Sequence, residues 1–189
     1  AAMAFALAEA GAHVLVNSRS LDRAQSLVEA LIRNGFTAEI AVFDVTDRAA
    51  MLDYVGSLGD LPLDCLINNA YIGGAGTVEL SSPDAYISSY DIAVVSAHNL
   101  VQGALRNLRI AAKSGQGASV INFASMYALV SPDQNVYESG ISTNPPFYGA
   151  AKAALIQWTR YAACEFGKEN IRFNSISPGP FPSDLVKAE

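Results

Sequence analysis

The sequence predicts an α/β fold in which helices cover both faces of a doubly wound parallel sheet, giving a three-layer α/β/α architecture. Short apolar runs bounded by turn residues alternate along the chain with segments of helical spacing. This alternation is expected for a parallel sheet whose strands are buried on both faces. The 189 residues are 51% hydrophobic and 16% charged, which is a globular composition. We therefore expect residues 1–189 to form a single domain.

The first half of the chain alternates between helix and strand. Residues 1–10 have the pattern of a helix, and Gly11 marks the turn into the first strand. The second helix ends at Asn34-Gly35, a favourable C-terminal cap, and the third is capped near Thr46. The expected elements are, in order, a helix at 1–10, a strand at 13–17, a helix at 21–33, a strand at 38–43 and a helix at 47–57.

The second half continues the alternation with longer helices. Its strands are short apolar runs, and its helices carry apolar residues at helical spacing. The expected elements are, in order, a strand at 64–68, a mostly helical stretch at 82–112, a strand at 118–124, a helix at 148–167 and a strand at 171–176.

The sequence opens on a helix and not on a strand. In a doubly wound fold, the first strand lies centrally in the sheet and carries a glycine-rich phosphate turn. No such turn precedes residues 13–17. Removing a central strand would leave two buried edges unpaired. We therefore expect the sequence to omit that strand before Ala1, and further residues after Ser183.

The composition excludes several classes of partner. The net charge is −6, the pI is about 4.8 and no block of Lys or Arg stands out, which argues against nucleic acid. The longest apolar stretch, residues 1–8, is too short to cross a bilayer. Cys65 and Cys164 lie in strand-like and helix-like runs, so we expect buried, reduced thiols in a cytoplasmic protein. A zinc site needs more ligands than these two cysteines and the distant His13 and His98 can offer, so no metal is expected.

Tyr148 and Lys152 form the most informative pair in the chain. They are four residues apart at the start of an expected helix, so their side chains share one face of it. A nearby positive charge favours phenolate and lowers a tyrosine pKa from its usual value of about 10. Such a phenol can exchange a proton with an alcohol near neutral pH. Taken alone, however, the pair is a common pattern on surface helices.

Three further polar signals lie at the ends of expected strands. Residues 68–70 (Asn-Asn-Ala) end one strand, Ser125 follows the next, and residues 178–180 (Pro-Gly-Pro) follow the last. The carboxyl ends of parallel strands form the edge where open α/β sheets bind ligands. Taken singly, Ser125 could be a turn cap and the asparagines a polar turn. Together with the Tyr–Lys pair, these signals indicate a site that polarises a carbonyl or alcohol oxygen.

The combined pattern resembles the short-chain dehydrogenase/reductase superfamily over nearly the whole chain. The resemblance rests on residues 66–70, 121–125 and 174–179 and on the Tyr-x-x-x-Lys pair at 148–152, in that family's order. It implies a Rossmann-type fold and an enzyme that transfers hydride between a nicotinamide cofactor and a substrate carbon.

The resemblance also implies roles for individual residues. Ser125 would hydrogen-bond the substrate oxygen, Tyr148 would pass the proton, and Lys152 would lower the tyrosine pKa and hold the nicotinamide ribose. The other implied cofactor contacts are Asp44 and Val45 at the adenine, Asn68, Asn69 and Ala70 along the adenosine and ribose, and Pro178, Gly179 and Ser183 beside the carboxamide. Asp44 could instead cap the helix that begins near it.

The segment after the first strand favours NADP(H) over NAD(H). An enzyme that prefers NAD usually offers an acid to the ribose hydroxyls, whereas here no acid follows Ser18 and Arg19 until Asp22. Arg19 can pair with a 2′-phosphate, and Ser18 can donate to it. The alternatives are a solvated Arg19 at a helix start, and NAD(H) as the cofactor.

The long helix departs from the family pattern at one position. Many members carry an asparagine where Ala93 stands, and alanine cannot make the same polar contact. Ser96 lies one turn further on and His98 and Asn99 lie beyond it, and the sequence does not choose among these three polar residues.

The loop at residues 126–147 is longer than in many family members and lies next to the expected site. Its amides, hydroxyls and acids suit a small polar substrate such as a sugar, a sugar acid or a polyol. The alternative is a plain surface excursion. Within the family, the loop resembles the subgroup that includes gluconate 5-dehydrogenase and 3-oxoacyl carrier-protein reductase-like members.

Three functions therefore stay open. The first is an NADP(H)-dependent oxidoreductase of a sugar-like carbonyl, the second a 3-oxoacyl thioester reductase, and the third a non-catalytic dinucleotide-binding subunit. In the family, helices equivalent to 82–112 and 148–167 pair across subunits, which implies a homodimer or homotetramer. Their apolar residues could equally be core.

Overall fold

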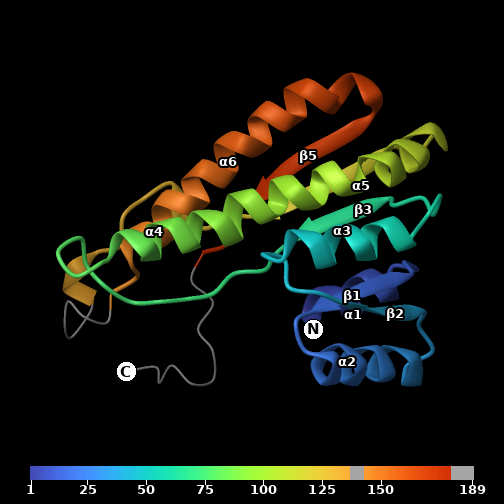
Figure 1. Cartoon of the computed structure of the whole chain (residues 1–189), viewed down its shortest axis with the longest axis horizontal. Coiled ribbons are helices and arrows are strands. Elements are labelled where there is room, and N and C mark those ends of the chain that lie inside the picture. Colours follow the sequence, from blue (N-terminus) through green and yellow to red (C-terminus); the bar gives the residue numbers. More distant parts are fainter. Residues whose placement is uncertain (137–142, 180–189) are drawn as a thin grey trace. The chain divides into compact units, whose positions relative to one another are not determined.

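The computed structural model describes residues 1–136 and 143–179 (Figure 1). The chain falls into two compact units, Ala1–Gly59 and Asp60–Glu189, and each is described by itself. Both units pair their strands in parallel and pack helices against them, which confirms the predicted α/β class. The predicted cofactor residue Ser183 and the middle of the loop at 126–147 lie outside the described residues.

The first unit contains a two-stranded parallel sheet with three helices. Its elements are α1 (Ala2–Glu9), β1 (Val14–Ser18), α2 (Leu21–Arg33), β2 (Ala38–Val42) and α3 (Arg48–Ser57). Ser18 and Val42 are register partners, so the carboxyl ends of β1 and β2 lie side by side. The Ser20 side chain caps α2, and Gly35 follows that helix with a φ of 82°, a conformation that favours glycine.

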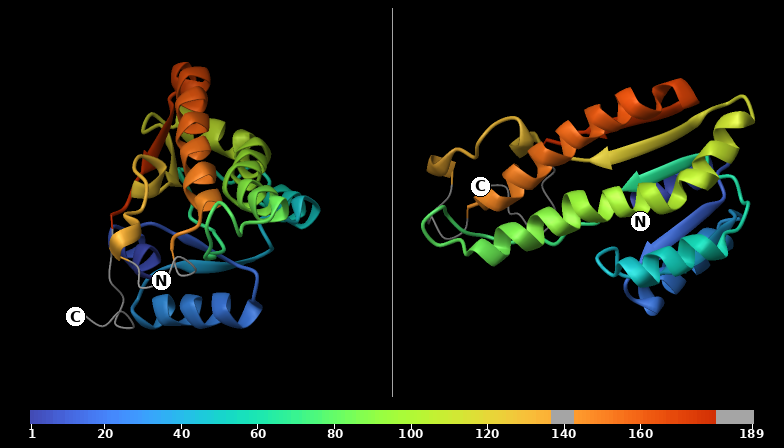
Figure 2. Two further views of the ribbon diagram at one scale, coloured as in Figure 1. Left: turned by 90° about the vertical axis from the view of Figure 1, so that its left-hand side faces the viewer. Right: turned by 45° about the horizontal axis from the view of Figure 1, so that its top comes forward.

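The second unit contains a three-stranded parallel sheet in the order β3–β4–β5. Its strands are β3 (Cys65–Asn68), β4 (Ala118–Phe123) and β5 (Ile171–Ile176). Its α-helices are α4 (Pro83–Tyr90), α5 (Ser96–Lys113) and α6 (Pro146–Phe166), and its short turns are η2 (Met126–Ala128), η3 (Gln134–Val136) and η5 (Gly167–Glu169). Figures 1 and 2 show α6 running along β5 and beside α4.

The stretch predicted as helical over 82–112 is one continuous helix with an irregular centre. Between α4 and α5, residues Asp91–Val95 form a π-helical turn, η1. Ala93, the position at which the sequence departs from the family pattern, lies in this turn and is buried. Such π-helical turns are rare and occur often at functional sites.

The remaining boundaries agree with expectation to within two residues, which is the ordinary uncertainty of element ends. Helix α6 begins earlier than predicted because Pro146 occupies its first turn, where a missing N–H does no harm. One expectation is wrong: Cys164 is exposed. It follows the buried Ala162 by two residues and therefore lies on the other side of α6. Cys65 is half-buried, and burial raises the pKa of its thiol.

Within residues 1–136 and 143–179, the structure contains no helix that combines the length and the apolar character needed to cross a membrane.

Candidate active site

The carboxyl ends of β4 and β5 are joined at the predicted site. The N–H of Ala124 donates to the carbonyl of Ile176 at 2.8 Å, and the N–H of Met126 donates to the carbonyl of Pro178 at 3.0 Å. Ser125 lies between these two bonds. The structure thus places the predicted substrate-binding serine beside the predicted carboxamide segment. Pro178 is half-buried, and Gly179 is exposed.

Lys152 reaches the same strand end from α6. Its side chain is only 3% exposed, and Nζ donates to the carbonyl of Phe123 at 2.6 Å. Nζ lies 5.9 Å from the centre of the Tyr148 ring, in accordance with the i, i+4 spacing. Burial lowers the pKa of Lys152 to about 8, because a charged ammonium is disfavoured away from water.

Ser125 is buried and adopts extended backbone angles immediately before η2. Its Oγ accepts a hydrogen bond from the N–H of Tyr127 at 3.2 Å. Ser125 therefore caps the turn η2, as the alternative interpretation of this residue expected. It does not exclude a catalytic role, because a hydroxyl that accepts one bond still has its own proton to donate.

A glycine brings the serine turn against the helix that carries Tyr148. A Cβ added to Gly149 would lie 2.6 Å from the carbonyl oxygen of Tyr127, closer than real Cβ atoms approach. The backbone of η2 therefore packs directly on the first turn of α6. This contact unites the stretches that carry Ser125 and Tyr148.

We expect Gly149→Ala to destabilise the protein by about 1–3 kcal/mol, because the atom in the way belongs to the backbone. Gly56→Ala is the matched control, since Gly56 is also helical and a Cβ there would meet nothing within 4 Å. That change should stabilise the protein slightly through helix propensity. Thermal unfolding of both variants tests the contact. Equal stability of the two would mean that η2 does not press on α6.

Asn68 is tied into a buried polar chain. Its Nδ2 donates to Oδ1 of Asn122 at 2.8 Å, and Nδ2 of Asn122 donates to Oγ1 of Thr159 at 2.8 Å. Asn122 is fully buried. These hydrogen bonds link β3, β4 and α6, so the amide nitrogen of Asn68 is already bonded within the protein interior. Asn69 and Ala70, which follow it, are exposed.

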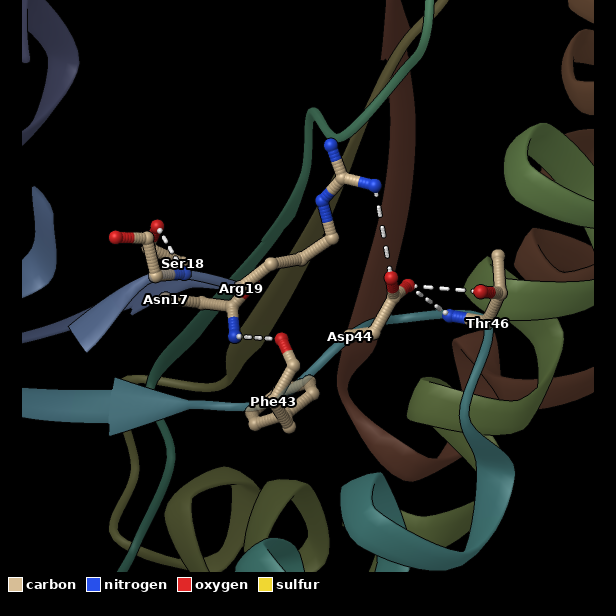
Figure 3. Close-up of polar contacts among 7 residues, drawn as sticks. Asn17, Ser18, Arg19, Phe43, Asp44 and Thr46 are labelled. Carbon is tan, nitrogen blue, oxygen red and sulfur yellow. Dashed lines mark hydrogen bonds and ion pairs between the residues drawn. The ribbon is translucent and has the colours of Figure 1, made fainter.

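The predicted adenosine-end residues of the first unit gather where β1 and β2 end (Figure 3). Nη1 of Arg19 lies 3.6 Å from Oδ2 of Asp44. The other oxygen of Asp44 accepts from the N–H of Thr46 at 2.9 Å and from its hydroxyl at 2.8 Å. The hydrogen bond from the Thr46 backbone is the main cause of a lowered Asp44 pKa. Val45, next to Asp44, is half-buried. Oγ of Ser18 accepts a hydrogen bond from the N–H of Ser20.

The helix-cap alternative for Asp44 is wrong. Asp47 caps α3, accepting from the N–H of Ala50 at 3.1 Å. Asp44 instead closes a local turn with Thr46, and this turn holds its carboxylate toward Arg19 (Figure 3). Asn17 fixes the neighbouring backbone by donating to the carbonyls of Ala41 and Phe43.

The polar residues near Ala93 are occupied elsewhere. Ser96 donates to the carbonyl of Ile92 at 2.6 Å within its own helix. His98 is exposed and stands edge-on to the ring of Trp158. The aromatic side chain that does approach Lys152 is Tyr71, which the sequence reasoning did not single out. Its position directly after the Asn-Asn-Ala signal was the available clue.

The described part of the 126–147 loop is held at its return end. Thr143 is buried, and its hydroxyl donates to the carbonyl of Gly76 at 3.0 Å. Nearer the start, the carboxylate of Asp133 accepts from the N–H and the side chain of Asn135. Among the residues that the structure describes, no cluster of three or more His, Cys, Asp or Glu side chains could hold a metal ion.

Comparisons with known proteins agree with one another. The model of the short chain dehydrogenase family matches residues 1–189. Gluconate 5-dehydrogenase of Gluconobacter oxydans is 31% identical, over 98% of this chain and 68% of that protein. The rhamnolipids biosynthesis 3-oxoacyl-(acyl-carrier-protein) reductase of Pseudomonas aeruginosa is 30% identical, over 96% of this chain and 68% of that protein.

A solved structure shares the fold. L-sorbose reductase from Gluconobacter frateurii, complexed with NADPH and L-sorbose, matches with a TM-score of 0.80 and 28% identity. The match covers 94% of this chain and 64% of that chain. The chain thus spans about two thirds of the length of these proteins.

Proposed function

Because the chain belongs to the short-chain dehydrogenase family, we propose that it is an NADP(H)-dependent oxidoreductase of a small sugar, sugar acid or polyol. The observation that carries this proposal is the approach of the serine turn and of Lys152 to one strand end beside the Tyr148 helix. The bound nicotinamide would supply hydride. The protein would supply the oxygen-binding hydroxyl, the proton and a fixed positive charge.

In the proposed reaction, Ser125 donates its hydroxyl hydrogen to the substrate oxygen and stabilises the charge that develops there. Tyr148 gives its proton to that oxygen during reduction and takes one during oxidation. Lys152 holds a positive charge close to the phenol while the proton is transferred. The buried Lys152 is held by the carbonyl of Phe123, so its position is fixed before substrate binds.

Among the proposed cofactor contacts, Arg19 and Ser18 fit a 2′-phosphate, because the Arg19 side chain is 62% exposed just after β1 and no acid follows the two residues until Asp22. Asp44, Val45, Asn68, Asn69 and Ala70 are proposed for the adenosine and ribose. Pro178, Gly179 and Ser183 are proposed for the carboxamide, with Tyr148 and Lys152 at the nicotinamide ribose.

We expect Arg19→Ala to weaken NADPH binding about 10- to 100-fold and to change NADH binding little, because a charge-assisted hydrogen bond to phosphate is lost. Arg23→Ala is the control, since Arg23 is exposed in the first turn of α2. Titration calorimetry with both cofactors measures the difference. An unchanged NADPH affinity in Arg19→Ala would leave Arg19 as a solvated charge.

The substrate class is proposed from the polar loop at 126–147 and from the relatives named for gluconate and sorbose. A 3-oxoacyl thioester reductase is the second candidate, since a relative of similar identity carries that name. A panel of keto sugars, sugar acids and 3-oxoacyl thioesters, assayed with NADPH and NADH, separates the two. Turnover of the thioesters alone would overturn the sugar proposal.

The non-catalytic alternative is tested by the same panel. A protein that binds NADPH but turns over no carbonyl would fit a dinucleotide-binding subunit.

We further propose a cytoplasmic homodimer or homotetramer. Tyr161 on α6 is 70% exposed and available for such contacts, whereas Leu155 on the same helix is buried in the core.

A further inference from the structure

Tyr71 stands against both members of the Tyr–Lys pair. It follows Asn69 and Ala70, which are exposed after the end of β3, and packs against a buried cluster of the second unit. Its ring meets the Tyr148 ring edge-on, with centres 4.8 Å apart and planes at 70°. Nζ of Lys152 lies 4.9 Å from the centre of the Tyr71 ring, nearer than its 5.9 Å to the Tyr148 ring.

The hydroxyl of Tyr71 is anchored from a third element. It lies 2.6 Å from Oγ of Ser89, a buried residue of α4. Ser89 donates its own proton to the carbonyl of Phe147 at 3.1 Å. A serine has one proton to give, so Tyr71 is the donor in its bond to Ser89. This chain connects Tyr71 to the residue that directly precedes Tyr148.

The ring of Tyr71 also packs against apolar side chains. It packs against a cluster of buried residues from η1, α5 and α6, namely Ala93, Val94, Ala97, Ala151 and Leu155. Burial raises the pKa of Tyr71, which keeps the phenol protonated, as donation to Ser89 requires. The side chain is thus fixed at both its face and its hydroxyl.

We propose that Tyr71 is a positioning residue that holds the ammonium of Lys152 and the ring of Tyr148 in the geometry that proton transfer needs. The aromatic face attracts the ammonium, while the edge contact sets the orientation of the Tyr148 ring. This role deepens the proposed oxidoreductase function and rests on it. Tyr71 itself does not exchange a proton with substrate.

The titration of Lys152 reports the contact directly. Among residues 1–136 and 143–179, the titratable groups that face its ammonium are the phenol of Tyr71, from the segment after β3, and that of Tyr148, on its own helix. Its hydrogen-bond acceptor is the carbonyl of Phe123, in β4. Burial disfavours the charged ammonium, whereas the ring of Tyr71 favours it. Removing that ring while keeping an apolar side chain should therefore lower the Lys152 pKa further.

The experiment compares Tyr71→Leu, Tyr71→Met and Tyr71→Phe in the full-length protein. Leu and Met remove the aromatic face and fill similar space, so either variant suffices if the other fails to fold. Both should lower kcat about tenfold, change substrate KM less than about threefold, and lower the Lys152 pKa by about half a unit. The pKa is read by NMR titration of ¹³C-labelled lysine side chains, with the signal assigned from Lys152→Arg.

Tyr71→Phe keeps the ring and should restore the Lys152 pKa and most of kcat. Tyr86→Leu is the control for loss of another tyrosine ring, because Tyr86, on α4, packs edge-on against Phe147. It should move neither quantity. A folded Tyr71→Leu or Tyr71→Met protein with wild-type kcat and wild-type Lys152 titration would overturn the positioning role. The titration needs no turnover, so it also decides the case if no carbonyl proves to be a substrate.

Discussion

Tyr148→Phe is expected to lower kcat about 10²- to 10⁴-fold, the usual contribution of a positioned general acid or base. The phenylalanine ring keeps the edge contact with Tyr71 and the packing of the first turn of α6. Only the exchangeable proton is removed. Cofactor affinity should therefore stay within about threefold of the wild-type value, because a single neutral hydrogen bond is at stake.

Steady-state kinetics with the best substrate of the panel, together with cofactor titrations, measure both quantities. Tyr161→Phe is the matched control, since Tyr161 lies on the same helix with its side chain in solvent. Full activity in Tyr148→Phe would end the proposed mechanism. Loss of cofactor binding in parallel with kcat would instead assign the phenol to binding.

Local patterns were sufficient for the elements and for the principal pair. The strand predicted at 171–176 has those bounds, and the one at 118–124 is one residue shorter, because an apolar run between turns carries its own signal. Helical spacing alone predicted that Lys152 would approach Tyr148, and the structure places them together. The resemblance to the short-chain dehydrogenase/reductase superfamily is confirmed by the family match over residues 1–189.

Local sequence patterns do not predict contacts between residues far apart in the chain. The bond from Lys152 to the carbonyl of Phe123 spans 29 positions, and the bond from Asn68 to Asn122 spans 54. Neither leaves a periodic trace in the sequence. The motif that contains Asn122 was recognised, yet its burial and its two partners depend on how three elements meet.

The π-helical turn shows a second limit. Apolar spacing over 82–112 predicts a helix, but it does not distinguish a regular turn from one with an extra residue. Residues Asp91–Val95 change pitch where the helix passes Tyr71 and α6. Tyr71 was missed for the same reason, because only the folded backbone turns it from the end of β3 toward Lys152.

Lys152→Met is expected to abolish most activity and, independently, to change how stability depends on pH. The activity loss follows from removal of the fixed positive charge beside Tyr148, and we expect kcat to fall at least about 10²-fold. The stability effect follows from burial, which lowers the Lys152 pKa from 10.5 to about 8 in the folded protein. The unfolded chain keeps the ordinary value.

Between about pH 8 and pH 10.5, the unfolded wild-type chain therefore binds more protons at this site than the folded protein does. The free energy of unfolding rises with pH wherever the unfolded state holds the extra proton. Relative to Lys152→Met, the wild-type protein should gain on the order of 3 kcal/mol across this window. Denaturant unfolding at a series of pH values measures the difference. Lys168→Met, which removes an exposed lysine, should give a curve parallel to that of the wild-type protein.

Parallel curves for the wild-type protein and Lys152→Met would mean that the ammonium titrates normally and lies in water. A wild-type free energy of unfolding that rises relative to that of Lys152→Met between about pH 8 and pH 10.5, with intact folding, would establish that the charge opposes the fold at neutral pH. Among the described residues, no carboxylate pairs with the Lys152 ammonium, and an unpaired buried cation is a poor stabilising element. The hydrogen bond to the Phe123 carbonyl does not restore the pKa to its ordinary value. Its position beside Tyr148 is therefore better explained by proton transfer than by packing. The pH dependence of unfolding tests whether the charge is buried, and the loss of kcat tests whether it is needed for proton transfer.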